Sequence, residues 1–228
     1  MASSENKFEC ESGGFSPVFS SSDIEKLKNN RDVVPLQTPW TFWLDRSIPG
    51  DSAEQYQANL KKIYTVSTVH EFWAVFNNIP TTDKIPNRFS YHLMRNEIKP
   101  LWEDKENIKG GTWRLKCNKL NTNRVWQELL LAAIGEQFSD CVHDADQICG
   151  VSVTVRDKDD LVQVWNVNAD LANDKKVLPK IHHLVPEVEF TLAFYKLADT
   201  KAVLCHLLKR HIHHPNNFEI RSIYGLGD

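Results

Sequence analysis

The sequence has no excess of basic residues. It holds 27 Lys and Arg against 30 Asp and Glu, so its formal net charge is −3. Proteins that coat nucleic acid along the phosphate backbone usually carry a strongly basic domain. The composition therefore speaks against broad backbone binding, and any contact with RNA must be local.

Long apolar runs and paired cysteines are missing as well. No stretch of about 18 apolar residues is present, so we expect no membrane span. The first residues include acidic side chains where a secretory signal would place an apolar core. The five cysteines are an odd number without a Cys-x-x-Cys pair, which argues against a disulfide framework and a cysteine-based zinc site. We expect a soluble cytoplasmic protein with reduced thiols.

A change of composition near Val33 suggests one domain with flanking segments. Residues 1–32 are rich in Ser, Gly, Asn, Lys and Glu without sustained periodicity, which predicts a flexible N-terminal arm. A chain of 228 residues buries one hydrophobic core but not comfortably two. We therefore place a single domain at 33–200 and a separate C-terminal tail at 201–228.

Three segments have the apolar spacing of helices. Residues 68–79 open with the capping pair Thr68 and Glu71 and carry an apolar face. Residues 123–138 carry an apolar stripe at intervals of three and four residues. Residues 174–185 form a weaker candidate, because Pro179 should shorten or kink a helix.

Between these helices the apolar residues alternate, as in half-buried strands. The predicted strands lie at 40–44, 112–116, 151–155, 161–165 and 189–195. The third and fourth flank a short charged segment and so predict a hairpin. Because strands and helices are mixed without a regular βαβ repeat, we predict an α+β fold whose antiparallel sheet is covered on one face. The other face is then free for a ligand.

Among the seven tryptophans, one stands apart from those in apolar patterns. Trp40, Trp43, Trp113 and Trp126 lie among alternating or striped apolar residues, so they are assigned to the core. Trp102 instead follows a proline in a loop and precedes Glu103, a poor position for core packing. A cationic purine such as 7-methylguanine stacks well on indole, and a neighbouring carboxylate can accept hydrogen bonds from the guanine edge.

An ordered series of motifs then identifies a family. The chain resembles the eukaryotic translation initiation factor 4E family from about Val33 to Thr200, through the motifs PLQ (35–37), WTFW (40–43), YQANL (56–60), VHEFWAVFNNI (69–79), IKPLWED (98–104), GGTW (110–113), IGEQF (134–138) and CGVSVTVR (149–156), continuing to Trp165. The segments WLDRSIPG (43–50) and NLKKIYTV (59–66) most resemble the class III branch.

The resemblance implies a mode of ligand binding. It implies a curved antiparallel sheet with three helices on the convex face and a slot on the concave face for the 7-methylguanosine cap of mRNA. The implied roles are stacking for Trp102 and Tyr56, guanine recognition for Glu103, contact with the N7 methyl group for Trp165, and phosphate binding for Arg156 and Lys158. It implies translation initiation or its regulation, with no catalytic residue, metal or cofactor, and we expect a monomer.

The resemblance also implies a second site on the convex face. This site would receive a helical peptide from an initiation factor 4G-type or a 4E-binding-protein-type partner. Its implied residues are Pro35, Leu36, Gln37, Val69, Trp73, Leu131 and Gly135.

The chain departs from the family pattern at several positions. Tyr56 replaces the usual second Trp, while Thr112 and Leu161 replace two cations on the phosphate side, so phosphate affinity should be weaker. Gln127 replaces a Leu of the peptide groove, which narrows the expected range of partners. After the motif at 198–200 the family's Ser-, Thr- and Lys-rich loop is absent, so the tail is divergent.

Several simpler readings stay open at this point. Trp165 ends a predicted strand and fits a core position, and Tyr56 fits a plain half-buried aromatic. Arg156 and Lys158 alone would be an ordinary solvated hairpin tip. The histidines of the tail near Cys205 lack the fixed spacing of metal ligands.

Two other functions compete with cap binding. One is a nucleotide hydrolase in which Asp157, Asp159 and Asp160 hold Mg²⁺ near a phosphate, although no general base or nucleophile accompanies them. The other is a cap-blind adaptor that retains only the protein-binding face.

Overall fold

The computed structural model describes residues 33–48, 50 and 53–198. The predicted arm at 1–32, the tail at 201–228 and its histidines lie outside the described residues. Within the described residues no helix is long and apolar enough to cross a membrane.

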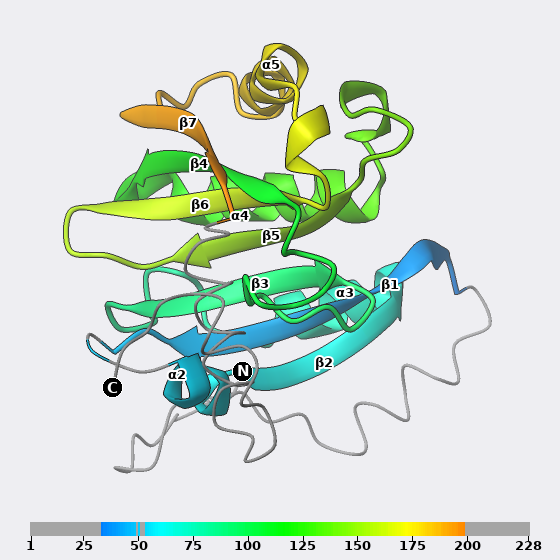
Figure 1. The fold of residues 1–228 in the computed structure, drawn as a ribbon. Coiled ribbons are helices and arrows are strands. Elements are labelled where there is room, and N and C mark those ends of the chain that lie inside the picture. Colours follow the sequence, from blue (N-terminus) through cyan, green and yellow to red (C-terminus); the bar gives the residue numbers. More distant parts are fainter. Residues whose placement is uncertain (1–32, 49, 51–52, 199–228) are drawn as a thin grey trace, which may run out of the picture.

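One antiparallel sheet organises this part of the chain. Its seven strands are β1 (Pro35–Arg46), β2 (Lys61–Thr68), β3 (Phe89–Arg95), β4 (Gly111–Asn118), β5 (Ile148–Thr154), β6 (Asp159–Asn166) and β7 (Leu192–Leu197). Their order across the described sheet is β2-β1-β3-β5-β6-β4-β7, and every neighbouring pair is antiparallel. Figure 1 shows the curved strands stacked from β2 to β7. The predicted α+β class and antiparallel sheet are confirmed.

Three helices cover one face of the sheet. They are α3 (Val69–Phe76), α4 (Lys119–Ile134) and α5 (Asp174–Leu184), and their buried apolar residues join a single core with Trp40, Phe42 and Leu44 of β1. A further short helix, α2 (Ala53–Asn59), lies next to β1 away from α3 and α4, and the segment joining β3 to β4 crosses in front of the sheet (Figure 1). Two 3-10 turns, Ser139–Cys141 and Ala169–Leu171, complete the described elements. The three predicted helices thus cover the convex face, and α2 is an addition.

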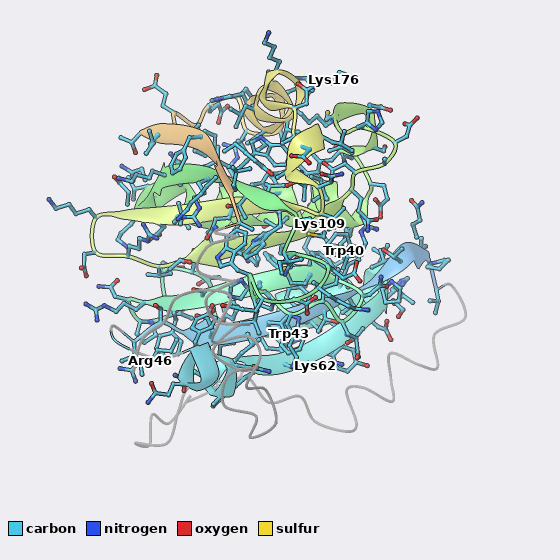
Figure 2. The ribbon with its side chains drawn as sticks, in the orientation of Figure 1. Trp40, Trp43, Arg46, Lys62, Lys109 and Lys176 are labelled. Atoms are coloured by element: carbon cyan, nitrogen blue, oxygen red, sulfur yellow. The ribbon has the colours of Figure 1, made fainter. Side chains whose placement is uncertain are left out.

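The two faces of the sheet bury two separate clusters. Neighbouring residues of a strand point to opposite faces, so Trp40 and Phe42 join the large helix-covered core while Trp43 joins a smaller cluster on the concave face (Figure 2). The four tryptophans assigned to the core are all buried, with exposed fractions between 0% and 6%. The smaller cluster contains Met94, Cys149 and Trp165 with Trp43, and Trp102 packs against it.

Helix α3 begins as predicted. The hydroxyl of Thr68 accepts a hydrogen bond from the Glu71 amide at 3.1 Å, while the Glu71 carboxylate accepts one from the Ser67 amide at 2.7 Å. This arrangement resembles a capping box, except that the Glu71 carboxylate accepts from the amide of Ser67 rather than from that of the N-cap residue Thr68. It aims Phe72 and Val75 into the core.

The predicted bounds of α4 were wrong, and α5 does not end at Pro179. Helix α4 begins at Lys119, because the Asn118 side chain caps it by accepting from the Leu120 amide at 3.0 Å. The only apolar residue of its first turn, Leu120, is exposed, so apolar spacing does not reveal this turn. It ends at Ile134 rather than at the predicted 138, and Gly135 follows as the cap. Helix α5 continues through Pro179, since the ring removes one hydrogen bond while buried Val177 and Ile181 hold the helix on the core.

Helix α2 and strands β2 and β3 were not predicted. Strand β3 is buried along almost its whole length and includes Ser90, His92 and Arg95, so it shows no alternation. Strand β1 also extends beyond the predicted 40–44 through Asp45 and Arg46, because these residues pair with Ser90 and Phe89 of β3. Of these polar strand positions, Ser90, His92 and Asp45 lie beside the candidate site.

Asp160 ties the β5–β6 hairpin to the start of α4. Its carboxylate is buried and accepts hydrogen bonds from Lys119 Nζ at 2.8 Å, Thr122 Oγ1 at 2.8 Å and the Arg156 amide at 2.9 Å. Asp160→Ala is expected to lower the free energy of unfolding by about 2–4 kcal/mol, because the Arg156 amide loses its acceptor and Thr122 keeps only the Asn118 carbonyl at 3.2 Å. Urea denaturation measures the change.

Asp157 provides the matched control for that prediction. It lies on the same hairpin but is exposed, and its carboxylate accepts from Asn87 Nδ2 at 2.6 Å. Asp157→Ala should cost less than about 1 kcal/mol. Equal losses in the two variants would show that the buried network around Asp160 contributes nothing special to stability.

Candidate functional site

A cavity of about 370 Å³ opens on the face of the sheet opposite α3, α4 and α5. Its lining combines aromatic, acidic and basic side chains: Ser47, Ile48, Tyr56, Ser90, His92, Pro100, Leu101, Trp102, Glu103, Arg114, Thr154, Arg156, Gln163 and Trp165. Five of the six residues predicted for the base and phosphates of a cap are among them. The sixth, Lys158, is exposed and does not line the cavity.

Trp102 lies on a loop whose backbone is fixed by hydrogen bonds from a buried side chain. The buried side chain of Asn107 donates hydrogen bonds to the carbonyls of Lys99 and Leu101, both at 2.8 Å. Pro100 and Leu101 are buried, whereas Trp102 and Glu103 remain partly exposed. The loop therefore presents an aromatic ring and a carboxylate side by side at the cavity.

Trp165 lies directly beneath Trp102. The two ring centroids are 4.4 Å apart with an interplanar angle of 30°. Trp165 is only 4% exposed, and its Nε1 donates to Ser152 Oγ at 2.8 Å. Trp165 is therefore both a buried residue, as the core interpretation predicts, and part of the cavity wall. A methyl group can approach the covered face of Trp165 only if Trp102 moves away.

Tyr56 reaches the cavity from α2. Its hydroxyl donates a hydrogen bond to Asp45 Oδ2. Burial, the charge of Asp45 with this hydrogen bond, and the charge of Glu103 all raise the pKa of Tyr56 above its ordinary value. The phenol thus stays protonated, and Glu103 lies close enough to Tyr56 to act on it electrostatically.

Beneath Tyr56 lies a polar network that sequence reasoning missed. Asp45 Oδ2 also contacts His92 Nε2 at 2.7 Å, and His92 Nδ1 lies 2.6 Å from Ser152 Oγ. Burial alone would raise the pKa of Asp45, but the charge and hydrogen bond of His92 and the hydrogen bond of Tyr56 outweigh it and lower the pKa. Single polar residues inside apolar strands are the signal that could have indicated this network.

The cations of the cavity are Arg114 and Arg156. Arg114 is half-buried, and its guanidinium carbon lies 6.0 Å from the Trp102 ring centroid. Burial and then the positive charge of Arg156 lower the pKa of Arg114. Within the described part of the chain, neither arginine forms an ion pair with an acid. Two neighbouring cations without a carboxylate partner favour an anionic ligand.

Sequence reasoning missed Arg114. It lies two residues after Thr112 on β4, so both side chains point to the concave face, and Arg114 Nε donates to Thr112 Oγ1 at 3.2 Å. Arg114 therefore supplies a cation two residues after Thr112, the position at which the family pattern has one. The alternation of side chains along a strand could have indicated that the two residues share a face. Leu161, the other position without a cation, is buried at 4% exposure.

The residues of the predicted peptide site lie on the opposite side of the sheet. Trp73 is half-buried on α3, and its ring lies edge-on to Phe72 and Phe76 with centroids 5.3 and 5.8 Å away. Pro35 pairs with Thr68 at the start of α3. The start of β1 therefore runs beside the helix that carries Val69 and Trp73.

The end of α4 contributes the rest of the predicted set. Leu131 is half-buried, and Gly135 follows it by four residues on the same helical face. A Cβ on Gly135 would lie 2.9 Å from the Leu131 carbonyl oxygen, so only glycine fits without a shift. A second cavity, of about 340 Å³, is lined by Gln37 of this set and by Ala133 and Glu136 near the end of α4.

Comparisons with known proteins agree with this architecture. The family model for eukaryotic initiation factor 4E matches residues 35–202. The initiation factor NCBP of Arabidopsis thaliana is 38% identical over 135 residues, which is 59% of this chain and 59% of that protein. Initiation factor 4E-1 of Nicotiana tabacum is 34% identical over 166 residues, 72% of this chain and 73% of that protein. The matched segments span 59% to 64% of the first curated relatives.

Solved structures of worm proteins have the same fold. The complex of C. elegans eIF4E-3 with the 4E-binding protein Mextli and a cap analog aligns with a TM-score of 0.64 and 27% identity, over 75% of this chain and 95% of that chain. Ascaris suum eIF4E-3 with m7G cap aligns with a TM-score of 0.60 and 31% identity, over 72% and 91%. With the family model matched across its sheet and helices, the chain belongs to the eukaryotic initiation factor 4E family.

Proposed function

We propose that this chain binds the 7-methylguanosine cap of mRNA and acts in translation initiation or its regulation. The observation that carries the proposal is one cavity lined by Trp102, Tyr56, Glu103 and two arginines that have no acidic partner among the described residues. A cap presents a cationic aromatic base, a guanine edge with hydrogen-bond donors, and phosphates. Each of these has a matching side chain in the cavity. The relatives solved with m7G and m2,2,7G caps support the assignment.

The base is proposed to lie on the Tyr56 and Glu103 side of Trp102. Stacked aromatic planes need roughly 3.5 Å each, so no base fits between Trp102 and Trp165, whose centroids are 4.4 Å apart. Glu103 would then accept from the N1 and N2 edge of the guanine. Contact between Trp165 and the N7 methyl group would accompany a shift of Trp102.

Arg114 and Arg156 are proposed to contact the phosphates, with Lys158 further out on the hairpin. Arg114→Met should weaken binding of 7-methyl-GTP by about 1 kcal/mol, or about fivefold, while leaving binding of 7-methylguanosine nearly unchanged. Adding Arg156→Met should flatten the dependence of affinity on salt. Calorimetric titration with both ligands at two salt concentrations makes the comparison.

Lys176→Met is the matched control, because Lys176 is an exposed cation on α5, the helix that covers the other face. It should change neither affinity nor salt dependence. If Arg114→Met weakens 7-methylguanosine and 7-methyl-GTP equally, Arg114 acts on the Trp102 ring and not on phosphate.

On the convex face we propose a site for a helical peptide of the initiation factor 4G type or the 4E-binding-protein type. The half-buried Trp73 and Leu131, with Pro35, Leu36, Gln37, Val69 and Gly135, would form it. The complex of the C. elegans relative with Mextli supports a protein partner for this fold. We also propose a monomeric, cytoplasmic, non-enzymatic protein of the class III branch; the segments at 43–50 and 59–66 support the branch.

The hydrolase alternative finds no support in the hairpin geometry. The oxygens of Asp160 already accept from Lys119, Thr122 and the Arg156 amide, and Asp157 accepts from Asn87. Within the described residues no group of three or more His, Cys, Asp or Glu side chains is placed to hold a metal ion.

Retention on a 7-methyl-GTP resin, with elution by 7-methyl-GTP but not by GTP, tests the proposal. We expect retention that is selective for the methylated base. A cap-blind adaptor would not be retained, and a hydrolase would release product from free 7-methyl-GTP.

A further inference from the structure

Asp45 and His92 form a buried pair beneath the cavity, and neither residue is among the proposed contacts with the cap. Asp45 is 1% exposed and His92 is 4% exposed, and they come from neighbouring strands β1 and β3. Burying a carboxylate is costly unless it receives hydrogen bonds. Here Asp45 Oδ2 receives two, from His92 Nε2 at 2.7 Å and from the Tyr56 hydroxyl.

The pair links two aromatic residues of the cavity wall. On one side it holds the hydroxyl of Tyr56. On the other side His92 Nδ1 lies 2.6 Å from Ser152 Oγ, which accepts from Trp165 Nε1 at 2.8 Å. A continuous chain of hydrogen bonds therefore runs from Tyr56 through Asp45, His92 and Ser152 to Trp165.

The direction of the bonds has an electronic consequence. His92 Nε2 faces a carboxylate, so it carries a proton and donates it. The phenol of Tyr56 donates to the same anion and stays protonated. Donation to a buried anion shifts electron density toward the phenol ring, and hydrogen bonds in a chain polarise one another. A more negative ring face attracts a cation more strongly.

We infer that Asp45, held by His92, positions Tyr56 and strengthens its ring as a partner for the positively charged methylated base. The inference rests on the proposed cap binding. Asp45 and His92 are positioning residues, since they act on the ligand through Tyr56. Their effect concerns selectivity for the methylated over the unmethylated base, because only the methylated base carries the delocalised positive charge.

Tyr56→Phe tests this, because it keeps the ring and removes only the hydroxyl. The ratio of affinities for 7-methyl-GTP and GTP, measured by calorimetric titration of the full chain, should fall about three- to tenfold. Tyr91→Phe is the control: Tyr91 is 0% exposed in the helix-covered core, and its hydroxyl has no hydrogen-bond partner among the described residues. That variant should keep the wild-type ratio.

Asp45→Asn extends the test by removing the negative charge at nearly constant shape. It should lower the same ratio, and combining it with Tyr56→Phe should cause no further fall, because both changes remove one interaction. If Asp45→Asn does not fold, Tyr56→Phe decides alone. A wild-type ratio in Tyr56→Phe, or an equal loss for both nucleotides, would overturn the inference while cap binding stands. A wild-type chain that does not bind 7-methyl-GTP would overturn cap binding and this inference together.

Discussion

Replacing Trp102 with Ala is expected to weaken binding of 7-methyl-GTP by about 1–3 kcal/mol, or about five- to 150-fold, without unfolding the chain. The ring is half-buried, so the base would lose its stacking surface. The fold should survive because the loop is held by Asn107 and by buried Pro100 and Leu101 rather than by the indole. Calorimetric titration measures the loss, and thermal unfolding checks the fold.

Two further measurements sharpen this prediction. Trp102→Phe should recover part of the lost affinity, because a smaller ring still stacks but offers less area and a weaker cation–π partner. GTP should lose less than 7-methyl-GTP in both variants, since it lacks the positive charge. Unchanged affinity in Trp102→Ala would remove Trp102 from the proposed site.

Trp73→Ala is expected to abolish capture of a partner peptide bearing Tyr, four intervening residues and Leu. Exposed aromatics that anchor an interface typically contribute about 2 kcal/mol or more, which is about 30-fold in affinity. Trp73 suits such a role because it is half-buried and braced edge-on by Phe72 and Phe76. Fluorescence anisotropy of a labelled peptide measures the effect.

The same variant should retain its 7-methyl-GTP binding. The sheet and the helix-covered core separate Trp73 from the cavity, and no described contact joins it to the smaller concave cluster. Resin retention is therefore the internal control. If a folded Trp73→Ala chain loses both activities, the two sites are not independent and Trp73 is misplaced.

The fold was predictable wherever local pattern and burial agree. The apolar pattern predicted the central part of β1 and most of β4, β5 and β6, and helical spacing predicted α3. Strand β3 was missed because the polar residues Ser90, His92 and Arg95 interrupt its apolar residues, although the strand is buried. The start of α4 was missed because the only apolar residue of its first turn is exposed and the turn is held by Asp160, a residue distant in the chain.

The sequence by itself determined which chemical groups this protein possesses and the order in which they occur. Trp102 beside Glu103 in a surface loop and Trp73 on an amphipathic helix follow from the local pattern. The position of Tyr56 in place of a second tryptophan follows from the resemblance to the family. Only the tertiary structure decided which groups meet. The fold brings Arg114 close to Arg156, packs Trp102 against Trp165, and joins Asp45, His92 and Tyr56 by hydrogen bonds. The physical reason is that these partners come from different strands, helices and loops, so their contacts depend on long-range packing that no local period encodes.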